Sequence, residues 1–123
     1  MKLRQIPGHF SVARYAPDAN LNPLFTREFC CITRTRNEVT VVCESDLLPA
    51  GVQKKEDGWV CLEVEGILDF SLTGILNQIT GPLAAAEVSL FAVSTYDTDY
   101  VLVKETFLEA ARKALSKAGI TVG

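Results

Sequence analysis

Two short polar clusters hold the side chains whose types and spacing could do chemistry, and the first is Asp69 with Ser71. It directly precedes an apolar run at helical spacing that begins at Leu72. Asp and Ser are typical N-cap residues, because their side-chain oxygens accept from the first N–H groups of a helix. The same N–H groups and the positive end of the helix dipole can instead hold an anion. Both interpretations stay open, since a cap uses only some of these donors.

The second cluster is the polar stretch from Ser94 to Asp99, between two β-type runs. Asp97 and Asp99 suit a tight turn, where Asp accepts from nearby backbone N–H groups. Alternatively, Asp99 accepts a charge-assisted hydrogen bond from a ligand cation. A metal site is not favoured, because no further carboxylates cluster with this pair. The remaining residues suit either a plain β-corner or a polar pocket with an aromatic wall: Ser94, Thr95, Tyr96 and Thr98.

The pattern of an enzyme is missing from the sequence. His9 is the single histidine, and its place far from the polar clusters predicts a surface residue rather than a partner for a nucleophilic serine. No glycine-rich nucleotide-binding string occurs. The sequence therefore predicts a protein with neither catalytic residues nor a cofactor.

Composition narrows the class of protein further. The 123 residues carry a net charge of −3 without a basic run, which argues against nucleic acid as a partner. No apolar run reaches the roughly 20 residues that cross a bilayer, and the first residues lack the apolar core of a signal peptide. We therefore expect a cytoplasmic protein without membrane contact.

The four cysteines form no CxxC motif and have no histidine near them: Cys30, Cys31, Cys43 and Cys61. Each lies in an apolar, β-like run. This pattern favours buried small hydrophobic residues over a zinc site, a disulfide or a redox role.

The periodicity predicts an α+β fold with a boundary at Glu56-Asp57-Gly58. After the boundary we expect strands at 59–64, 88–93, 100–103 and 120–122 and helices at about 71–86 and 105–118, with Gly119 just beyond the last helix. This is a ferredoxin-like βαββαβ order. Before the boundary, strands at 10–15, 27–34 and 39–43, single turns near 22–25 and 45–49 and a short edge strand at 51–55 give a similar order with shortened helices.

Several of these segments resemble small bacterial and fungal proteins with tandem ACT domains. The strings are FCCITRT (29–35), EG (65–66), DFSLTGIL (69–76), GPLA (81–84) and STYDTDYVLV (94–103). Similar segments occur in one half of the CASTOR cytosolic arginine sensors and, more distantly, in aspartokinase regulatory domains. The resemblance implies an ACT-like unit with shortened helices at 1–57, an ACT domain at 58–123, and helices on one face of an antiparallel sheet.

The resemblance also implies a non-catalytic amino-acid sensor with its ligand between ACT units. Carried over residue by residue, the binding positions are Asp69, Phe70, Leu72, Ser89, Leu90, Thr95, Tyr96, Thr98 and Asp99. The sensors have four units and this chain has two, so a complete site implies a homodimer. Leu72 stands where the sensors have an acidic residue, so the identity of the amino acid and of any regulated enzyme stays open. The alternative is a structural or protein-interaction module without a small-molecule ligand.

Overall fold

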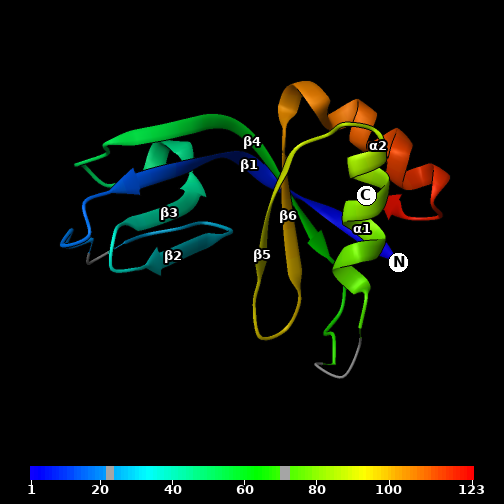
Figure 1. Ribbon diagram of the computed structural model, residues 1–123, viewed down its shortest axis with the longest axis horizontal. Helices are drawn as coiled ribbons and strands as arrows, with labels where there is room; N and C mark the ends of the chain where they lie inside the picture. The colour runs from blue at the N-terminus through cyan, green and yellow to red at the C-terminus, as the bar shows by residue number, and fades with distance from the viewer. Residues whose placement is uncertain (22–23, 70–72) are drawn as a thin grey trace. The chain divides into compact units, whose positions relative to one another are not determined.

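The computed structural model describes residues 1–21, 24–69 and 73–123, which form two compact units (Figure 1). We call Met1–Ile6 with Val60–Gly123 the helical unit, and Pro7–Trp59 the strand unit. Two long strands, β1 (Lys2–Tyr15) and β4 (Lys54–Val64), run through both units. Each unit is described by itself below.

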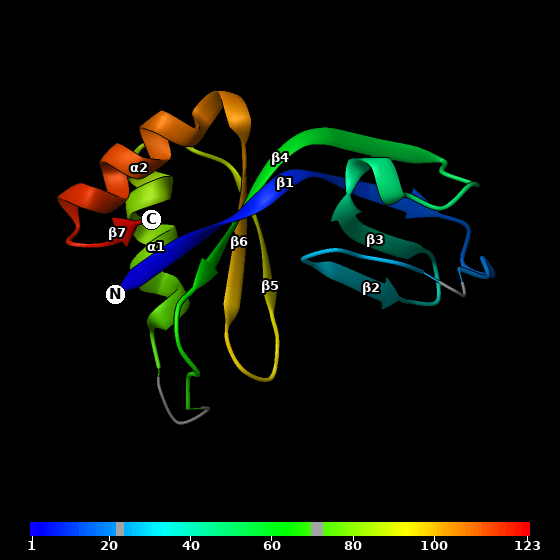
Figure 2. The same cartoon turned by 180° about the vertical axis from the view of Figure 1, so that it is seen from behind.

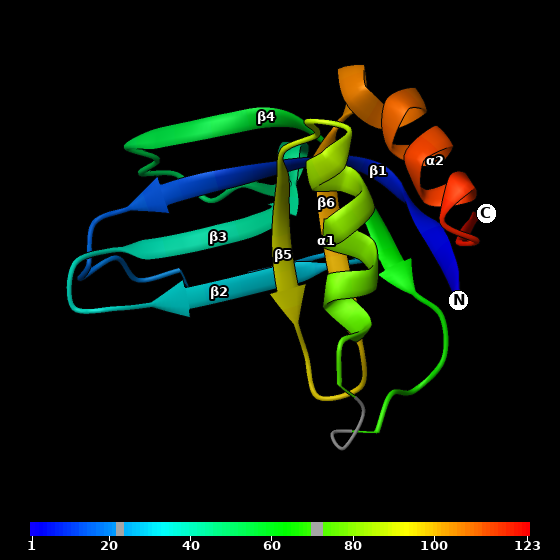
Figure 3. The same cartoon turned by 45° about the vertical axis from the view of Figure 1, so that its right-hand side comes forward.

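The helical unit is an antiparallel sheet with two helices on one face. Its strand order is β1-β4-β6-β5, where β5 is Leu90–Ser94 and β6 is Asp99–Lys104; the short β7 (Thr121–Val122) adds to β1 in parallel. Helices α1 (Ile75–Ala85) and α2 (Leu108–Lys117) lie side by side (Figure 3). The predicted α+β class with two helices on an antiparallel sheet is confirmed.

Alternating valines and leucines explain why this sheet buries only one face against the helices. The buried core joins alternate residues of β4 and β6 to the inner face of both helices: Val60, Leu62, Val64, Val101, Val103, Ile79, Leu83, Ala111 and Leu115. Residues two apart on a strand share a face, so each strand contributes one apolar row. Burial of these rows is the main stabilising contribution.

The first helix begins later than predicted. It starts at Ile75 rather than near 71, and its N-cap is Gly74, with φ of 75° and no side-chain capping bond. The interpretation of Asp69 as an N-cap is therefore wrong, and Ser71 lies outside the described residues. The left-handed backbone at this position favours glycine, which has no Cβ to clash.

The second helix follows the prediction closely. A 3₁₀ turn, η2 (Glu105–Phe107), leads into α2, which ends at Lys117. Gly119 has φ of 83°, and the N–H of Ile120 donates to the Leu115 carbonyl at 2.9 Å. This left-handed closure is the one expected of a glycine just after a helix.

The strand unit is a four-stranded arrangement in the order β2-β3-β1-β4, without an α-helix among its described residues (Figure 2). Strands β2 (Cys30–Arg34) and β3 (Val39–Glu44) lie where strands were predicted at 27–34 and 39–43, and they pair as an antiparallel hairpin. The 3₁₀ turn η1 (Ser45–Leu47) is the single turn predicted near 45–49. The Tyr15 hydroxyl donates to the Pro49 carbonyl at 2.7 Å and closes one side of the core. The turn expected near 22–25 lies partly outside the described residues.

The two strands predicted on either side of residues 56–58 form one continuous strand. Strand β4 is continuous from Lys54 to Val64, so the edge strand expected at 51–55 and the strand at 59–64 join through Glu56-Asp57-Gly58. The sequence indicated a boundary between two units there, because Asp and Gly are common in turns. Gly58 takes φ of 81° within the strand, which explains the glycine without a chain reversal.

No helix among the described residues has both the length and the hydrophobicity that a bilayer span requires. His9 is exposed, as predicted. All four cysteines lie in strands; Cys43 and Cys61 are buried, while Cys30 and Cys31 are half-buried.

Candidate functional site

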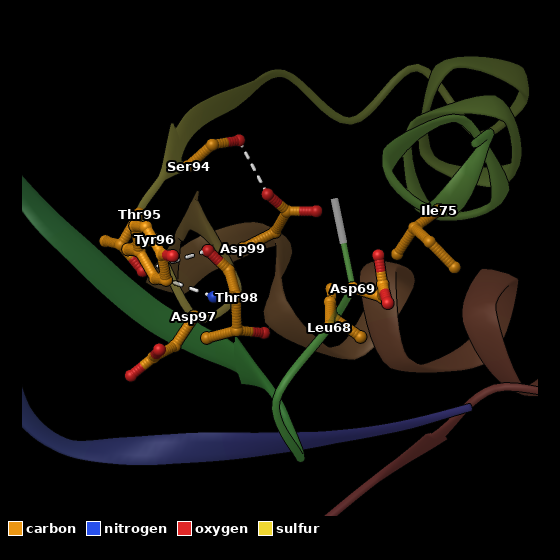
Figure 4. A pocket seen from close by; sticks show the side chains of 9 residues that line it. All are labelled: Leu68, Asp69, Ile75, Ser94, Thr95, Tyr96, Asp97, Thr98 and Asp99. Atoms are coloured by element: carbon orange, nitrogen blue, oxygen red, sulfur yellow. Dashed lines mark hydrogen bonds between the residues drawn. The ribbon is translucent and has the colours of Figure 1, made fainter. Parts of the chain in front are cut away.

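A pocket of about 200 Å³ lies in the helical unit, between the β5–β6 corner and the segment that leads to α1 (Figure 4). Nine residues line it: Leu68, Asp69, Ile75, Ser94, Thr95, Tyr96, Asp97, Thr98 and Asp99. A water molecule's share of liquid volume is about 30 Å³, so the pocket has room for roughly seven waters. This is a space for a small molecule.

The β5–β6 corner is fixed by its two threonines. The Thr95 N–H and hydroxyl both donate to the Thr98 carbonyl, at 2.8 and 3.1 Å, and the Thr98 N–H donates to Thr95 Oγ1 at 3.3 Å. Thr98 is only 7% exposed, and its hydroxyl donates to the Val64 carbonyl at 2.8 Å. The corner is therefore tied to itself and to β4, so the side chains around it are held in place.

Asp99 is the carboxylate that the corner orients most directly. The Ser94 hydroxyl donates to Asp99 Oδ1 at 2.6 Å, across the last residue pair of the β5–β6 ladder. Figure 4 shows the Asp99 carboxylate on the pocket side of the corner, whereas the Asp97 carboxylate points away from it. Asp99 is therefore positioned to accept from a bound molecule.

The opposite wall is the segment before α1. The Leu68 N–H donates to the Asp97 carbonyl at 2.7 Å, which fastens this segment to the corner. Asp69 follows and lies beside Ile75, the first residue of α1 (Figure 4). The first N–H groups of any α-helix lack intrahelical partners, and the N-cap residue here is Gly74, which has no side chain to cap them. One wall of the pocket therefore carries the hydrogen-bond acceptors of the β5–β6 corner, and the opposite wall contains the start of α1.

The charged side chains among the described residues that line this pocket are all acidic. The described lining includes no lysine, arginine or histidine and three aspartates, of which Asp97 points its carboxylate away from the pocket (Figure 4). Carboxylates favour a positively charged group, and the helix N-terminus favours a negatively charged one. A small zwitterion satisfies both requirements.

Five of the nine residues predicted as binding positions line this pocket: Asp69, Thr95, Tyr96, Thr98 and Asp99. Ser89 is exposed and Leu90 packs against the core, and neither belongs to the lining. Phe70 and Leu72 lie outside the described residues. The assignment of all nine residues to ligand binding stays a prediction.

The structure adds two residues that the sequence did not single out as pocket residues, Leu68 and Ile75, which contribute apolar walls. It also gives Ser94, already a candidate from the sequence, a definite role in holding Asp99. Residues at the two ends of a tight hairpin face each other, which explains this pairing. Leu68 lines the pocket because its segment is bonded to Asp97, a contact that no local pattern in the sequence indicates.

One titratable group beside the corner has a strongly altered environment. The Tyr100 hydroxyl donates to Glu63 Oε2 at 2.8 Å, and Arg4 contacts Glu63 Oε1 at 3.3 Å. Burial, and then the hydrogen bond and charge of Glu63, raise the pKa of Tyr100 to about 12. Tyr100 therefore stays neutral near neutral pH, which leaves it a structural partner of Glu63.

Within the three described ranges, no group of three or more His, Cys, Asp or Glu residues is arranged to hold a metal ion. The Asp97 and Asp99 carboxylates point in different directions (Figure 4). The arrangement suits hydrogen bonding to an organic ligand better than metal coordination.

Comparison with known proteins gives a consistent assignment. Residues 54–120 match the model of the ACT domain. The crystal structure of protein Atu0741 from Agobacterium tumefaciens is 32% identical and superimposes with a TM-score of 0.90, covering 99% of this chain and 91% of that one. The regulatory subunit of aspartate kinase from Thermus thermophilus is 10% identical, with a TM-score of 0.68 over 94% of this chain and 95% of that one, and so shares the fold.

A curated relative extends this picture. The human cytosolic arginine sensor for mTORC1 subunit 1 is 40% identical over 50 residues, which are 41% of this chain and 15% of the sensor. The aligned segment is thus a small part of that relative's length. The family-model match spans more than half of the chain, and the Atu0741 structure covers nearly all of it. The chain therefore belongs to the ACT domain family.

Proposed function

We propose that this protein binds a free amino acid in the pocket at the β5–β6 corner and acts as a non-catalytic regulatory or sensor protein. The observation that carries the proposal is that one small pocket has the held Asp99 carboxylate on one wall and the start of α1, with its glycine N-cap, on the other. An amino acid has the two charges that this pairing favours. The relatives whose names mention arginine sensing or aspartate kinase regulation support the general class.

In this proposal the ligand lies across the pocket. Its α-ammonium donates to Asp99, and Asp69 lines the wall beside α1. Its α-carboxylate accepts from the N–H groups at the start of α1. Leu68, Ile75 and Tyr96 then surround the side chain of the ligand and select for its size and polarity. The remaining predicted positions, Phe70, Leu72, Ser89 and Leu90, belong to the proposed site through their family counterparts.

We further propose that a second copy of the chain covers the ligand. The residues along the corner of the pocket are exposed, and two large apolar side chains lie on the segments that form the pocket. Ile67 is 82% exposed and Tyr96 is 80% exposed. Exposed apolar residues beside a polar pocket are typical of surfaces that bind a partner. A two-fold homodimer would bring two copies of this patch together.

The same proposal includes the division of the chain into an ACT-like unit at 1–57 and an ACT domain at 58–123. It also includes a cytoplasmic location and a regulated enzyme or protein as the downstream partner.

The rival function is an interaction module whose pocket stays empty. Its two exposed apolar side chains would serve that role equally well, so the ligand test decides between the two functions.

The test is thermal unfolding with each of the twenty amino acids in turn. A ligand present at 100 times its Kd stabilises the folded state by about 2.7 kcal/mol, which raises Tm measurably. We expect one chemically related group of amino acids to raise Tm, and light scattering to show the dimer with that ligand. If every amino acid leaves Tm unchanged at millimolar concentration, the interaction module is the better description.

A further inference from the structure

Two cysteines of the strand unit face each other across a pair of strands. In the antiparallel β2–β3 ladder, Cys30 is the direct register partner of Cys43. Both contact the same apolar cluster, built around Ala13, Tyr15, Val39 and Val41. Their thiols therefore lie on the same face of the hairpin.

The register also fixes the kind of pair they form. The Thr35 N–H donates to the Glu38 carbonyl at 2.9 Å, so Thr35 and Glu38 are a hydrogen-bonded pair at the turn. Hydrogen-bonded and non-hydrogen-bonded pairs alternate along an antiparallel ladder. Five pairs further from the turn, Cys30 and Cys43 form a non-hydrogen-bonded pair.

Such pairs have the closest backbones in a sheet. Their Cα atoms are about 4.5 Å apart, within the range of roughly 4.4–6.8 Å that a disulfide spans. A bond between the two thiols therefore needs rotation of side chains but little movement of the strands.

The other two cysteines are excluded by position. Cys31 is adjacent to Cys30 on β2, so its side chain points to the opposite face of the strand. Cys61 lies on β4, outside the β2–β3 hairpin. Cys30 with Cys43 is therefore the pair of cysteines that the β2–β3 register places in position for a disulfide.

We propose that Cys30 and Cys43 are a redox modification site, which closes to a disulfide on exposure to a low-molecular-weight disulfide such as oxidised glutathione. The half-buried Cys30 thiolate attacks first, forming a mixed disulfide and releasing one glutathione thiolate. Cys43 then loses its proton and attacks the Cys30 sulfur, and the second glutathione leaves as thiolate. The two cysteines are oxidised and one glutathione disulfide is reduced to two thiols.

The two thiols are expected to undergo thiol–disulfide exchange slowly. Burial raises the pKa of Cys30, and burial raises the pKa of Cys43 to about 12. The thiolate is the attacking form, so little of it is present at neutral pH and exchange accelerates as pH rises. A site of this kind responds to sustained oxidising conditions rather than to a brief pulse.

The consequence for the fold is local. Strand β2 is at the edge of the strand unit's sheet and pairs only with β3 among the described strands. A disulfide at the end of the hairpin farthest from its turn ties this edge strand down. It also restricts the unfolded chain, and a cross-link over a loop of this length should raise Tm by about 5–10 °C.

The test uses the full chain in its native state. It is equilibrated in buffers with increasing ratios of oxidised to reduced glutathione, quenched in acid, denatured and alkylated, and its peptides are mapped by mass spectrometry. We expect a Cys30–Cys43 disulfide at high ratio, a raised Tm, and reversal by added thiol. The Cys31→Ser protein is the matched control and should give the same bond, whereas Cys30→Ser should give no rise in Tm on oxidation.

Three outcomes would overturn the proposal. All four cysteines could remain alkylatable at every glutathione ratio, or the bond could include Cys31, or Cys30 could remain as a mixed disulfide with Cys43 still reduced. If Cys30→Ser does not fold, peptide mapping of the parent and of Cys31→Ser still decides the result.

Discussion

The two units contain the same hairpin, placed 60 residues apart in the chain. Strands Cys30–Arg34 and Val39–Glu44 correspond to Leu90–Ser94 and Asp99–Lys104, and each hairpin leads directly into a 3₁₀ turn. The corners even share their hydrogen bonds. Thr35 donates through its N–H to Glu38 at 2.9 Å, and Thr95 to Thr98 at 2.8 Å.

The difference between the hairpins lies in the side chains at the corner. In the helical unit Ser94 holds Asp99, and both line the pocket. In the strand unit Arg34 stands in place of Ser94 and donates to the carbonyls of Pro17 and Ala19, at 2.6 and 2.7 Å. The buried Val39 stands in place of Asp99. The hairpin alone therefore does not make a ligand site; one copy presents polar groups, while the other uses its corner to hold its own chain.

Of the substitutions that compare the two hairpins, replacing Glu44 should change the free energy of unfolding most. Glu44 is 2% exposed and accepts from Thr26 Oγ1 at 2.6 Å and from the N–H of Arg27 at 2.8 Å. Glu44→Ala removes charge-assisted bonds and should lower the free energy of unfolding by about 1–3 kcal/mol. Lys104→Ala, at the corresponding position, should cost less than about 0.5 kcal/mol. Urea unfolding of both proteins checks this, and equal losses would contradict it.

The same carboxylate predicts how stability depends on acid. Burial alone would raise the pKa of Glu44, but hydrogen bonds from Thr26, Arg27 and Glu28 prevail and lower it below its ordinary value of 4.5. Its contribution is therefore present above about pH 4.5 and is lost as pH falls through the lowered pKa. Urea titrations between neutral pH and about pH 3 should show this loss in the parent. A Glu44→Gln protein with the same acid dependence would show that other carboxylates cause it.

Arg34 and Ser94 test the contrast between the corners directly. Arg34→Ala should lower the free energy of unfolding by about 1 kcal/mol, because its bonds to the 17–19 segment are charge-assisted but exposed. It should not change ligand affinity. Ser94→Ala should leave stability nearly unchanged and weaken ligand binding about three- to tenfold through the loss of one hydrogen bond to Asp99. The contrast fails if the two substitutions exchange these effects.

The smallest effect concerns alkaline pH in the helical unit. The pKa of Tyr100 is about 12 in the folded chain, against an ordinary value of 10.0. A tyrosine with a raised folded pKa contributes stability that is complete below pH 10 and is lost as pH rises toward the folded value. Tyr100→Phe should therefore flatten the fall in unfolding free energy between about pH 9 and about pH 11. An unchanged slope would assign the fall to other groups.

The sequence was sufficient for much of the fold because its periodicity is strong. The alternating residues around Val60 and Val101 and the helical spacing around Ala111 predict the elements of the helical unit correctly. The later start of α1 was missed, because Asp69 and Ser71 look like caps while the chain uses Gly74. The continuity of β4 through Gly58 was missed because a glycine inside a strand resembles a turn.

The candidate site was predictable only in part. The polar corner from Ser94 to Asp99 stands out locally, since it interrupts two β-type runs. The second wall depends on the contact between Leu68 and Asp97, which joins segments far apart in sequence and leaves no local pattern. The sequence predicted a similar order of elements in the two units, but it did not predict that their hairpin corners share a hydrogen bond, because most of the corner residues differ.

The most direct test of the central claim is calorimetry of the parent and of Asp99→Asn with the amino acid that raises Tm most. The substitution keeps the shape of the side chain and removes the charge that the ligand ammonium requires. We expect affinity to fall about ten- to a hundredfold, equivalent to roughly 1.5–3 kcal/mol, while the free energy of unfolding changes little. An Asp99→Asn protein that binds as tightly as the parent would contradict the account and would place the ammonium site elsewhere.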